Sequence, residues 1–283
     1  MKNYQELISK IHDFPTLPTI YSSLLETISN PLSTVQDVAN IISKDQASTV
    51  KLIKVVNSPL YGIATKVDTV TQAIFYLGFN EVKNIILALS ILKLFNDTKS
   101  FTYFNIIDLW KHSIAVGIIT RILGQKIGVV NLENYFVAGL LHDIGKLIFY
   151  RIIGDDYPKL LSYNYNNNLV LYETERKELG ITHEIAGELI ANQWKLPHSI
   201  TQAIKSHSTF RTDGNSDTIL ACVHLANIIA NLLMLGNSGS NLVAQPNYNV
   251  WNYINLSSGS FKEMFQEIID SYNKSIEILT VSK

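Results

Sequence analysis

His142 and Asp143 lie side by side in the segment GLLHDIGKLIFY, residues 139–150, which is otherwise almost wholly apolar. Burying the Asp143 carboxylate without a partner costs several kcal/mol or forces its protonation. The sequence therefore predicts a group that compensates this charge. Two alternatives fit: a metal ion held by both residues, or an internal hydrogen-bonded pair that links neighbouring helices.

Further histidines are spaced along the chain on segments with helical periodicity. His112 precedes the His142–Asp143 pair, and His183 in THEIAGE, His207 in IKSHS and His224 in VHLAN follow it. Imidazole and carboxylate ligands suit Zn, Mn, Fe or Ni, so a neighbouring helix carrying His112 could complete a metal site. For His183 and His207, the favoured interpretation is a satisfied or surface histidine near a helix end.

Composition limits the class of protein. The 283 residues are enough for two lobes or one large unit, and the formal net charge of −1 gives no general attraction to nucleic acid or anionic membranes. The single cysteine, Cys222, excludes an internal disulfide framework and suits a reducing compartment. The apolar runs are short or interrupted, which argues against membrane insertion. These features predict a cytoplasmic protein.

Apolar spacing is helical almost throughout, with no convincing strand alternation. It predicts an N-terminal lobe (1–97), a histidine-bearing lobe (98–236) and a loop with a C-terminal helix (237–283), with a join at DTKSF. In the second lobe we expect helices near 104–127, 132–150, 156–166, 182–194, 198–208 and 216–236. Ser33 with Gln36 and Ser260 with Glu263 have the spacing of helix-capping boxes.

Two N-terminal segments allow alternative interpretations. TVQDVANIISKDQASTVKLIKVVN has the form of a helix-turn-helix, but its second helix offers only Lys51 and Lys54 as basic residues. DNA-binding modules concentrate basic residues, so we expect packing and no DNA binding. In NSPLYG, Asn57 is predicted either to remain free for ligand contacts or simply to end a helix.

The order of these motifs resembles the HD superfamily of metal-dependent phosphohydrolases and, more narrowly, the HDOD family of bacterial signalling proteins. The resemblance spans roughly residues 12–235 and includes LLHDIGK, HEIAGE, IKSH and the run from LPTIYSSLLETI to GFNEVKNIIL. It implies an all-α, two-lobed helical fold and a role in signal transduction.

The departures from active HD enzymes concern the metal site. Where those enzymes carry a metal-binding aspartate, this chain has Asn227, and where the binuclear type has a second histidine, it has Ser208. The resemblance thus implies a weakly held Fe, Mn, Ni or Zn ion on His112, His142, Asp143 and Asn227. Lys146 is predicted to pair with Asp143 or to meet a phosphate. His224, on the same helix face as Asn227, is predicted to pack in the core or to replace the lost carboxylate.

The resemblance and its departures together predict a non-catalytic regulatory module. Its partners would be other signalling proteins or a small nucleotide. The alternative is a metal-dependent phosphohydrolase or phosphodiesterase that acts on a nucleotide or cyclic dinucleotide.

Overall fold

The computed structural model describes residues 4–58, 60–95, 105–212 and 217–280, and these residues form helices and connecting loops with no β-strand. The all-α prediction is therefore confirmed. No helix in these ranges is both long and apolar enough to cross a membrane. The predicted join at DTKSF falls outside the described residues.

The chain divides into two compact units. The histidine unit comprises residues 1–14 and 98–268, and the second unit comprises residues 15–97 and 269–283. The division falls within the last helix, α15 (Ser258–Thr280). Most of the polar residues singled out from the sequence lie in the histidine unit, so its construction matters most for function.

Among the described residues, five short to medium helices and the last part of α15 build the second unit around a mostly aliphatic core. Thr34 and Asp37, rather than the expected Ser33 and Gln36, form the capping box of its second helix, because the Thr34 hydroxyl reaches the Asp37 backbone N–H. Asn57 ends a helix: its side chain exchanges hydrogen bonds with the Val67 backbone at 2.7 and 2.8 Å. Its polar groups are thus used internally. The helices are α2 (Thr19–Ser29), α3 (Val35–Ser43), α4 (Gln46–Val56), α5 (Val70–Leu77) and α6 (Phe79–Phe95).

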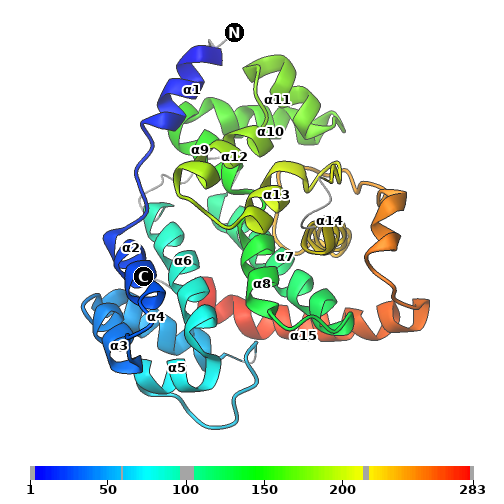
Figure 1. Ribbon diagram of the computed structural model, residues 1–283. Coiled ribbons are helices and arrows are strands. Elements are labelled where there is room, and N and C mark those ends of the chain that lie inside the picture. Colours follow the sequence, from blue (N-terminus) through cyan, green and yellow to red (C-terminus); the bar gives the residue numbers. More distant parts are fainter. Residues whose placement is uncertain (1–3, 59, 96–104, 213–216, 281–283) are drawn as a thin grey trace. The chain divides into compact units, whose positions relative to one another are not determined.

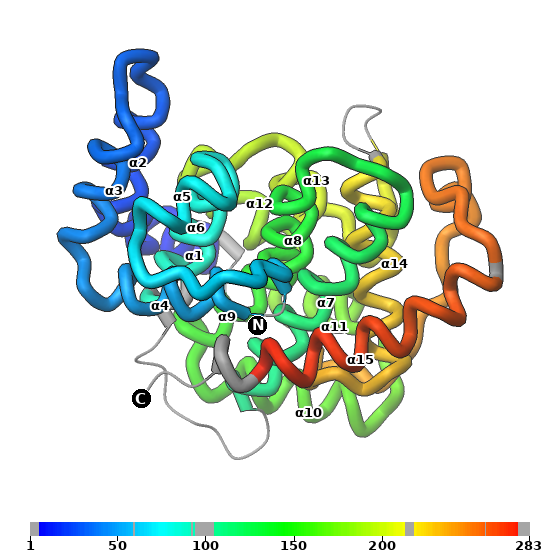
Figure 2. Tube along the Cα trace, turned by 90° about the horizontal axis from the view of Figure 1, so that it is seen from below, coloured from blue at the N-terminus to red at the C-terminus, as the bar shows by residue number. Residues whose placement is uncertain are grey.

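In the histidine unit, α7 (Ile106–Lys126) and α8 (Leu132–Leu141) pack side by side, as both views show (Figures 1 and 2). Two glycines allow this close approach. A Cβ on Gly117 would come within 2.9 Å of the Phe136 carbonyl oxygen, and a Cβ on Gly139 within 2.7 Å of the Val116 carbonyl oxygen. The close packing brings His112 on α7 near the end of α8.

The helix expected over 132–150 is interrupted. The structure has α8 up to Leu141 and α9 from Ile144 to Ile153, with His142 and Asp143 in the turn between them. Asp143 has φ −99° and ψ 16°, which is outside the helical range. Apolar periodicity continues through both helices, and this is why the sequence predicts one helix.

The remaining helices surround α7–α9. A helix not predicted from the sequence, α11, lies between two that were. The last helix begins at Ser258, and Ser257 rather than Ser260 accepts the hydrogen bond from a first-turn N–H. The elements are α1 (Tyr4–His12), α10 (Asp156–Asn166), α11 (Leu171–Leu179), α12 (His183–Gln193), α13 (His198–Ser206), α14 (Asp217–Leu232) and a 3-10 helix (Tyr248–Asn252).

Candidate metal centre

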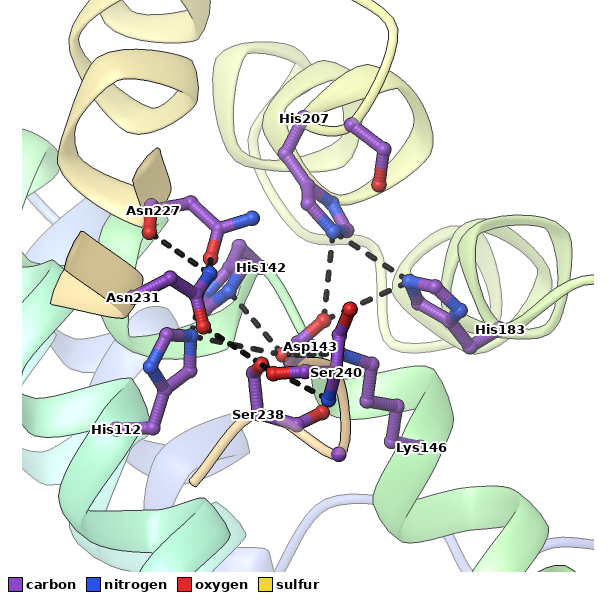
Figure 3. Close-up of polar contacts among 12 residues, drawn as sticks. His112, His142, Asp143, Lys146, His183, His207, Asn227, Asn231, Ser238 and Ser240 are labelled. Carbon is purple, nitrogen blue, oxygen red and sulfur yellow. Dashed lines mark hydrogen bonds and ion pairs between the residues drawn. The ribbon is translucent and has the colours of Figure 1, made fainter. Parts of the chain in front are cut away.

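Four histidines gather around Asp143 inside the histidine unit (Figure 3). Because Asp143 lies in the turn between α8 and α9, its carboxylate faces residues from several other helices. Two groups of candidate ligands share it, and in each group the ligand atoms lie within 4.8 Å of one another. The groups are His112, His142 and Asp143, and Asp143, His183 and His207. Each of these five residues is at most 2% exposed.

Small residues hold α12 against α9 and so place His183 beside Asp143. A Cβ on Gly145 would overlap the carbonyl of His183, and the Gly187 amide is also in contact range. His183 is the first residue of α12, directly after its N-cap Thr182. His207 follows the end of α13. The sequence favoured a satisfied or surface histidine near a helix end for both. Both lie at a helix end with Nδ1 hydrogen-bonded, but neither is at the surface: the structure buries them against Asp143.

The nitrogen atoms of this second group converge on one carboxylate oxygen. His207 Nε2 lies 3.3 Å and His183 Nε2 3.5 Å from Asp143 Oδ1. The two nitrogen atoms are 3.4 Å apart. His142 Nε2 lies 3.2 Å from the other carboxylate oxygen, Oδ2. Three imidazole nitrogens therefore surround the Asp143 carboxylate (Figure 3).

The opposite ring nitrogens fix which tautomer each histidine adopts. Nδ1 of His142 donates to the Gly139 carbonyl oxygen at 2.7 Å, and Nδ1 of His207 donates to that of Ile204 at 3.1 Å. Nδ1 of His183 donates to Glu175 Oε2 at 2.6 Å. Carbonyl and carboxylate oxygens only accept, so in each neutral ring Nε2 carries a lone pair. These lone pairs face the carboxylate of Asp143.

Lys146 contacts only Oδ2 of Asp143, so the nitrogen atoms that converge on Oδ1 favour a further positive charge on that side. Asp143 Oδ1 and His142 Nε2 have no hydrogen-bond partner, although both are buried. Burial raises the pKa of Asp143, but His142 and Lys146 hold it well below its usual range, so the carboxylate is ionised. Burial lowers the pKa of His183, yet the Glu175 carboxylate reverses this and raises it overall. A proton on His183 or a metal ion among these atoms would each supply the missing charge.

The residues chosen from the sequence on the other side of Asp143 are less well arranged for a metal. His112 Nε2 lies 3.0 Å from Asn227 Oδ1 and 3.9 Å from Asp143 Oδ2. Asn227 Oδ1 also accepts from Asn231 Nδ2 at 3.0 Å. The amide oxygen of Asn227 thus already has two hydrogen-bond partners. Burial and the neighbouring His142 lower the pKa of His112 to about 3, which keeps this ring neutral.

The sequence predicted that Lys146 either pairs with Asp143 or meets a phosphate, and in the structure it pairs with Asp143. Its Nζ donates to Asp143 Oδ2 at 2.7 Å and to the Ser238 carbonyl oxygen at 2.9 Å. This contact connects the loop after α14 to the candidate metal centre (Figure 3). His224 does not face Asp143: its Nδ1 donates to the His207 carbonyl oxygen, and its Nε2 accepts from the Asn247 backbone N–H. Both nitrogens are occupied, and His224 supports the backbone of a candidate ligand.

Comparison with known proteins agrees with this architecture. The family model of the HDOD domain matches residues 14–210, which is more than half of the chain. The chain therefore belongs to the HDOD domain family. The match includes all five clustered residues and ends before Asn227.

Solved structures of similar proteins cover almost the whole chain. An HDOD domain protein from Geobacter sulfurreducens is 25% identical, with a TM-score of 0.82 over 97% of this chain and 96% of that one. A protein from Shewanella amazonensis SB2B, whose name proposes phosphohydrolase activity, is 22% identical, with a TM-score of 0.75 over 96% and 97%. At that identity the likeness concerns the fold alone.

A curated relative is longer than this chain. An uncharacterised protein of Treponema pallidum (strain Nichols) is 23% identical over 202 residues, which are 71% of this chain and 39% of the relative. The matched region thus spans about two fifths of that relative's length.

Proposed function

We propose that this HDOD chain is a regulatory module of bacterial signal transduction that binds one divalent transition-metal ion and does not hydrolyse phosphoesters. The carrying observation is the convergence of His183 Nε2 and His207 Nε2 on Oδ1 of Asp143, an oxygen that has no hydrogen-bond partner. The ion would be held by Asp143, His183 and His207, with His142 adjacent. Such a set of nitrogen and carboxylate donors suits Zn, Fe, Mn or Ni.

The absence of catalysis is proposed from what surrounds these residues. Hydrolysis by a metal centre requires an open coordination position for water and access for substrate. The candidate ligands are at most 2% exposed. Lys146, the cation that could meet a phosphate, has its ammonium directed to Asp143 and Ser238. Asn227 adds no negative charge on the His112 side.

The partners of such a module are proposed to be other signalling proteins or a small nucleotide, and its location the cytoplasm. A metal ion that joins α9, α12 and the end of α13 would stiffen this side of the unit. Binding or loss of the ion would then change the surface that a partner recognises. We propose that the module neither binds DNA nor inserts into a membrane.

Metal content tests the proposal. Protein purified without added metal should contain about one ion per chain, or should take up Co²⁺ with a visible spectrum typical of nitrogen and oxygen ligands. We expect His183→Ala and His207→Ala to lose binding and His112→Ala to retain most of it. His12→Ala, which removes an exposed histidine of α1, is the matched control. Binding that survives His207→Ala but not His112→Ala would contradict the proposed position.

The second candidate function is a metal-dependent phosphohydrolase or phosphodiesterase, favoured by the buried His/Asp cluster itself. A panel of phosphomonoesters, cyclic nucleotides and cyclic dinucleotides with Mn, Ni, Fe or Mg separates the two. Turnover of about 1 per second or faster, within the ordinary range of enzymes, would establish the enzyme if His142→Ala abolished it.

A further inference from the structure

Glu175 is a buried carboxylate that belongs to neither group of candidate ligands. It lies on α11, is 0% exposed and is bound by three donors. The Tyr157 hydroxyl donates to its Oε1 at 2.6 Å. The backbone N–H and the Nδ1 of His183 donate to its Oε2 at 2.8 and 2.6 Å. Two of these three donors belong to one residue, His183.

The three histidines nearest Asp143 differ in what their outer nitrogen contacts. His142 and His207 donate to neutral backbone carbonyls, whereas His183 donates to a carboxylate. A carboxylate behind an imidazole fixes the ring orientation and makes the opposite nitrogen a stronger metal ligand. The environment of His183 is the one that metal-binding histidines commonly have.

Glu175 also changes the charge balance of the cluster. Asn227 leaves the His112 side with a neutral amide. On the opposite side, Glu175 places a second negative charge one imidazole ring away from Asp143. The negative charges are thus concentrated near His183 and His207. The most favourable position for a cation therefore lies on that side of Asp143.

We propose that Glu175, held by Tyr157, is a positioning residue that fixes the tautomer of His183 and strengthens its bond to a metal ion. This inference rests on the proposed metal-binding function. It makes the position at His183 and His207 the tighter one, and it explains why a carboxylate remains fully buried 8 residues before that histidine.

Two substitutions separate charge from orientation. Glu175→Gln keeps an oxygen that can accept from Nδ1 but removes the charge, and Glu175→Ala removes both. Loss of such outer partners weakens metal binding by ~10- to 100-fold. We expect Co²⁺ or Zn²⁺ affinity to fall by about 10-fold in Glu175→Gln and further in Glu175→Ala. Nitrogen-15 NMR of the metal-free protein should show the Nδ1–H tautomer of His183 retained in Glu175→Gln and lost in Glu175→Ala.

The matched control is Glu133→Gln, which neutralises another buried carboxylate, 2% exposed and paired with Arg121. It should lower thermal stability but not metal affinity. It therefore measures the effect of losing a buried carboxylate outside the candidate metal centre. Unchanged affinity in both Glu175 variants, or a loss no greater than that of Glu133→Gln, would overturn the inference. A wild-type chain that binds neither Co²⁺ nor Zn²⁺ would instead overturn the proposed function.

Discussion

At the residue scale, the candidate metal centre depends on a balance of a few buried charges. Asp143 is ionised, Lys146 neutralises it on one side, and the imidazole nitrogens face it on the other. Buried charges are tolerated only when they are paired and hydrogen-bonded. Changes to single residues should therefore have distinct effects on the metal-free and the metal-bound protein.

Asn227→Asp should create a second metal position. The substitution would place a carboxylate where an amide oxygen lies 3.0 Å from His112 Nε2, opposite His142 and Asp143. The added negative charge favours a dication there. We expect the metal content to rise from about one toward two ions per chain, measured by elemental analysis. Asn241→Asp, at an exposed position of the loop after α14, is the control and should change nothing. An unchanged stoichiometry would mean that His112 cannot turn toward the ion.

Lys146→Met should destabilise the metal-free protein more than the metal-bound protein. Methionine has a similar length but leaves Asp143 without its cation, and breaking a buried ion pair in this way costs about 3–5 kcal/mol. A bound metal ion supplies part of the missing charge. Urea unfolding of both forms measures the difference. Equal losses in the two forms would show that the metal ion does not compensate Asp143.

At the element scale, glycine contacts between helices decide which side chains meet. Gly117 and Gly139 set the α7–α8 distance, which places His112 near His142 with ring centroids 5.4 Å apart. Gly145 sets the α9–α12 distance and thus brings His183 to Asp143. The site is assembled from close helix crossings, so it should be sensitive to small changes in side-chain volume.

Gly145→Ala tests this dependence. Its Cβ would overlap the His183 carbonyl, so α9 and α12 would have to separate. Overpacking of this kind costs about 1–3 kcal/mol, and we expect weaker metal binding along with a lower Tm. Gly259→Ala in α15 meets only a side-chain atom at 3.7 Å and is the control. Calorimetry and Co²⁺ titration measure both effects. A Gly145→Ala protein with normal metal affinity would show that the α9–α12 distance is not critical.

Most helices could be predicted from apolar periodicity, and the exceptions bear on function. The interruption at His142–Asp143 was missed because apolar residues continue on both sides of it. Helix α11, LYETERKEL, was missed because six of its nine residues are charged or polar and its two leucines lie at its opposite ends. Its buried residue Glu175 therefore gave no signal. His112, His142 and Asp143 could be singled out from residue type, but the approach of His183 and His207 depends on glycine contacts between distant segments.

At the scale of the whole molecule, each of the two compact units has its own core of aliphatic and aromatic side chains, in which tyrosines are buried. Tyr21 lies in the second unit, and Tyr135, Tyr150 and Tyr157 lie in the histidine unit. Burial raises the pKa of Tyr21, Tyr135 and Tyr150 from 10.0 to about 12. The pKa of Tyr157 is raised well above its ordinary value by burial and by Glu175.

These tyrosines should make both units lose stability at alkaline pH. Below pH 10 they are neutral in the folded and the unfolded chain, so their effect on stability is constant. Between pH 10 and about 12 the unfolded chain has released these protons and the folded chain has not. The unfolded state then binds fewer protons, and the free energy of unfolding falls, by at most about 1.4 kcal/mol per pH unit for each tyrosine.

Urea unfolding from neutral pH to pH 11 measures this loss, and phenolate absorbance in the near ultraviolet follows ionisation in the same samples. We expect the buried tyrosines to ionise only together with unfolding. Tyr135→Phe should reduce the slope of stability against pH, because phenylalanine has no proton to lose, whereas Tyr248→Phe should leave it unchanged. Equal slopes in the two variants would show that Tyr135 ionises without unfolding the helices that bury it.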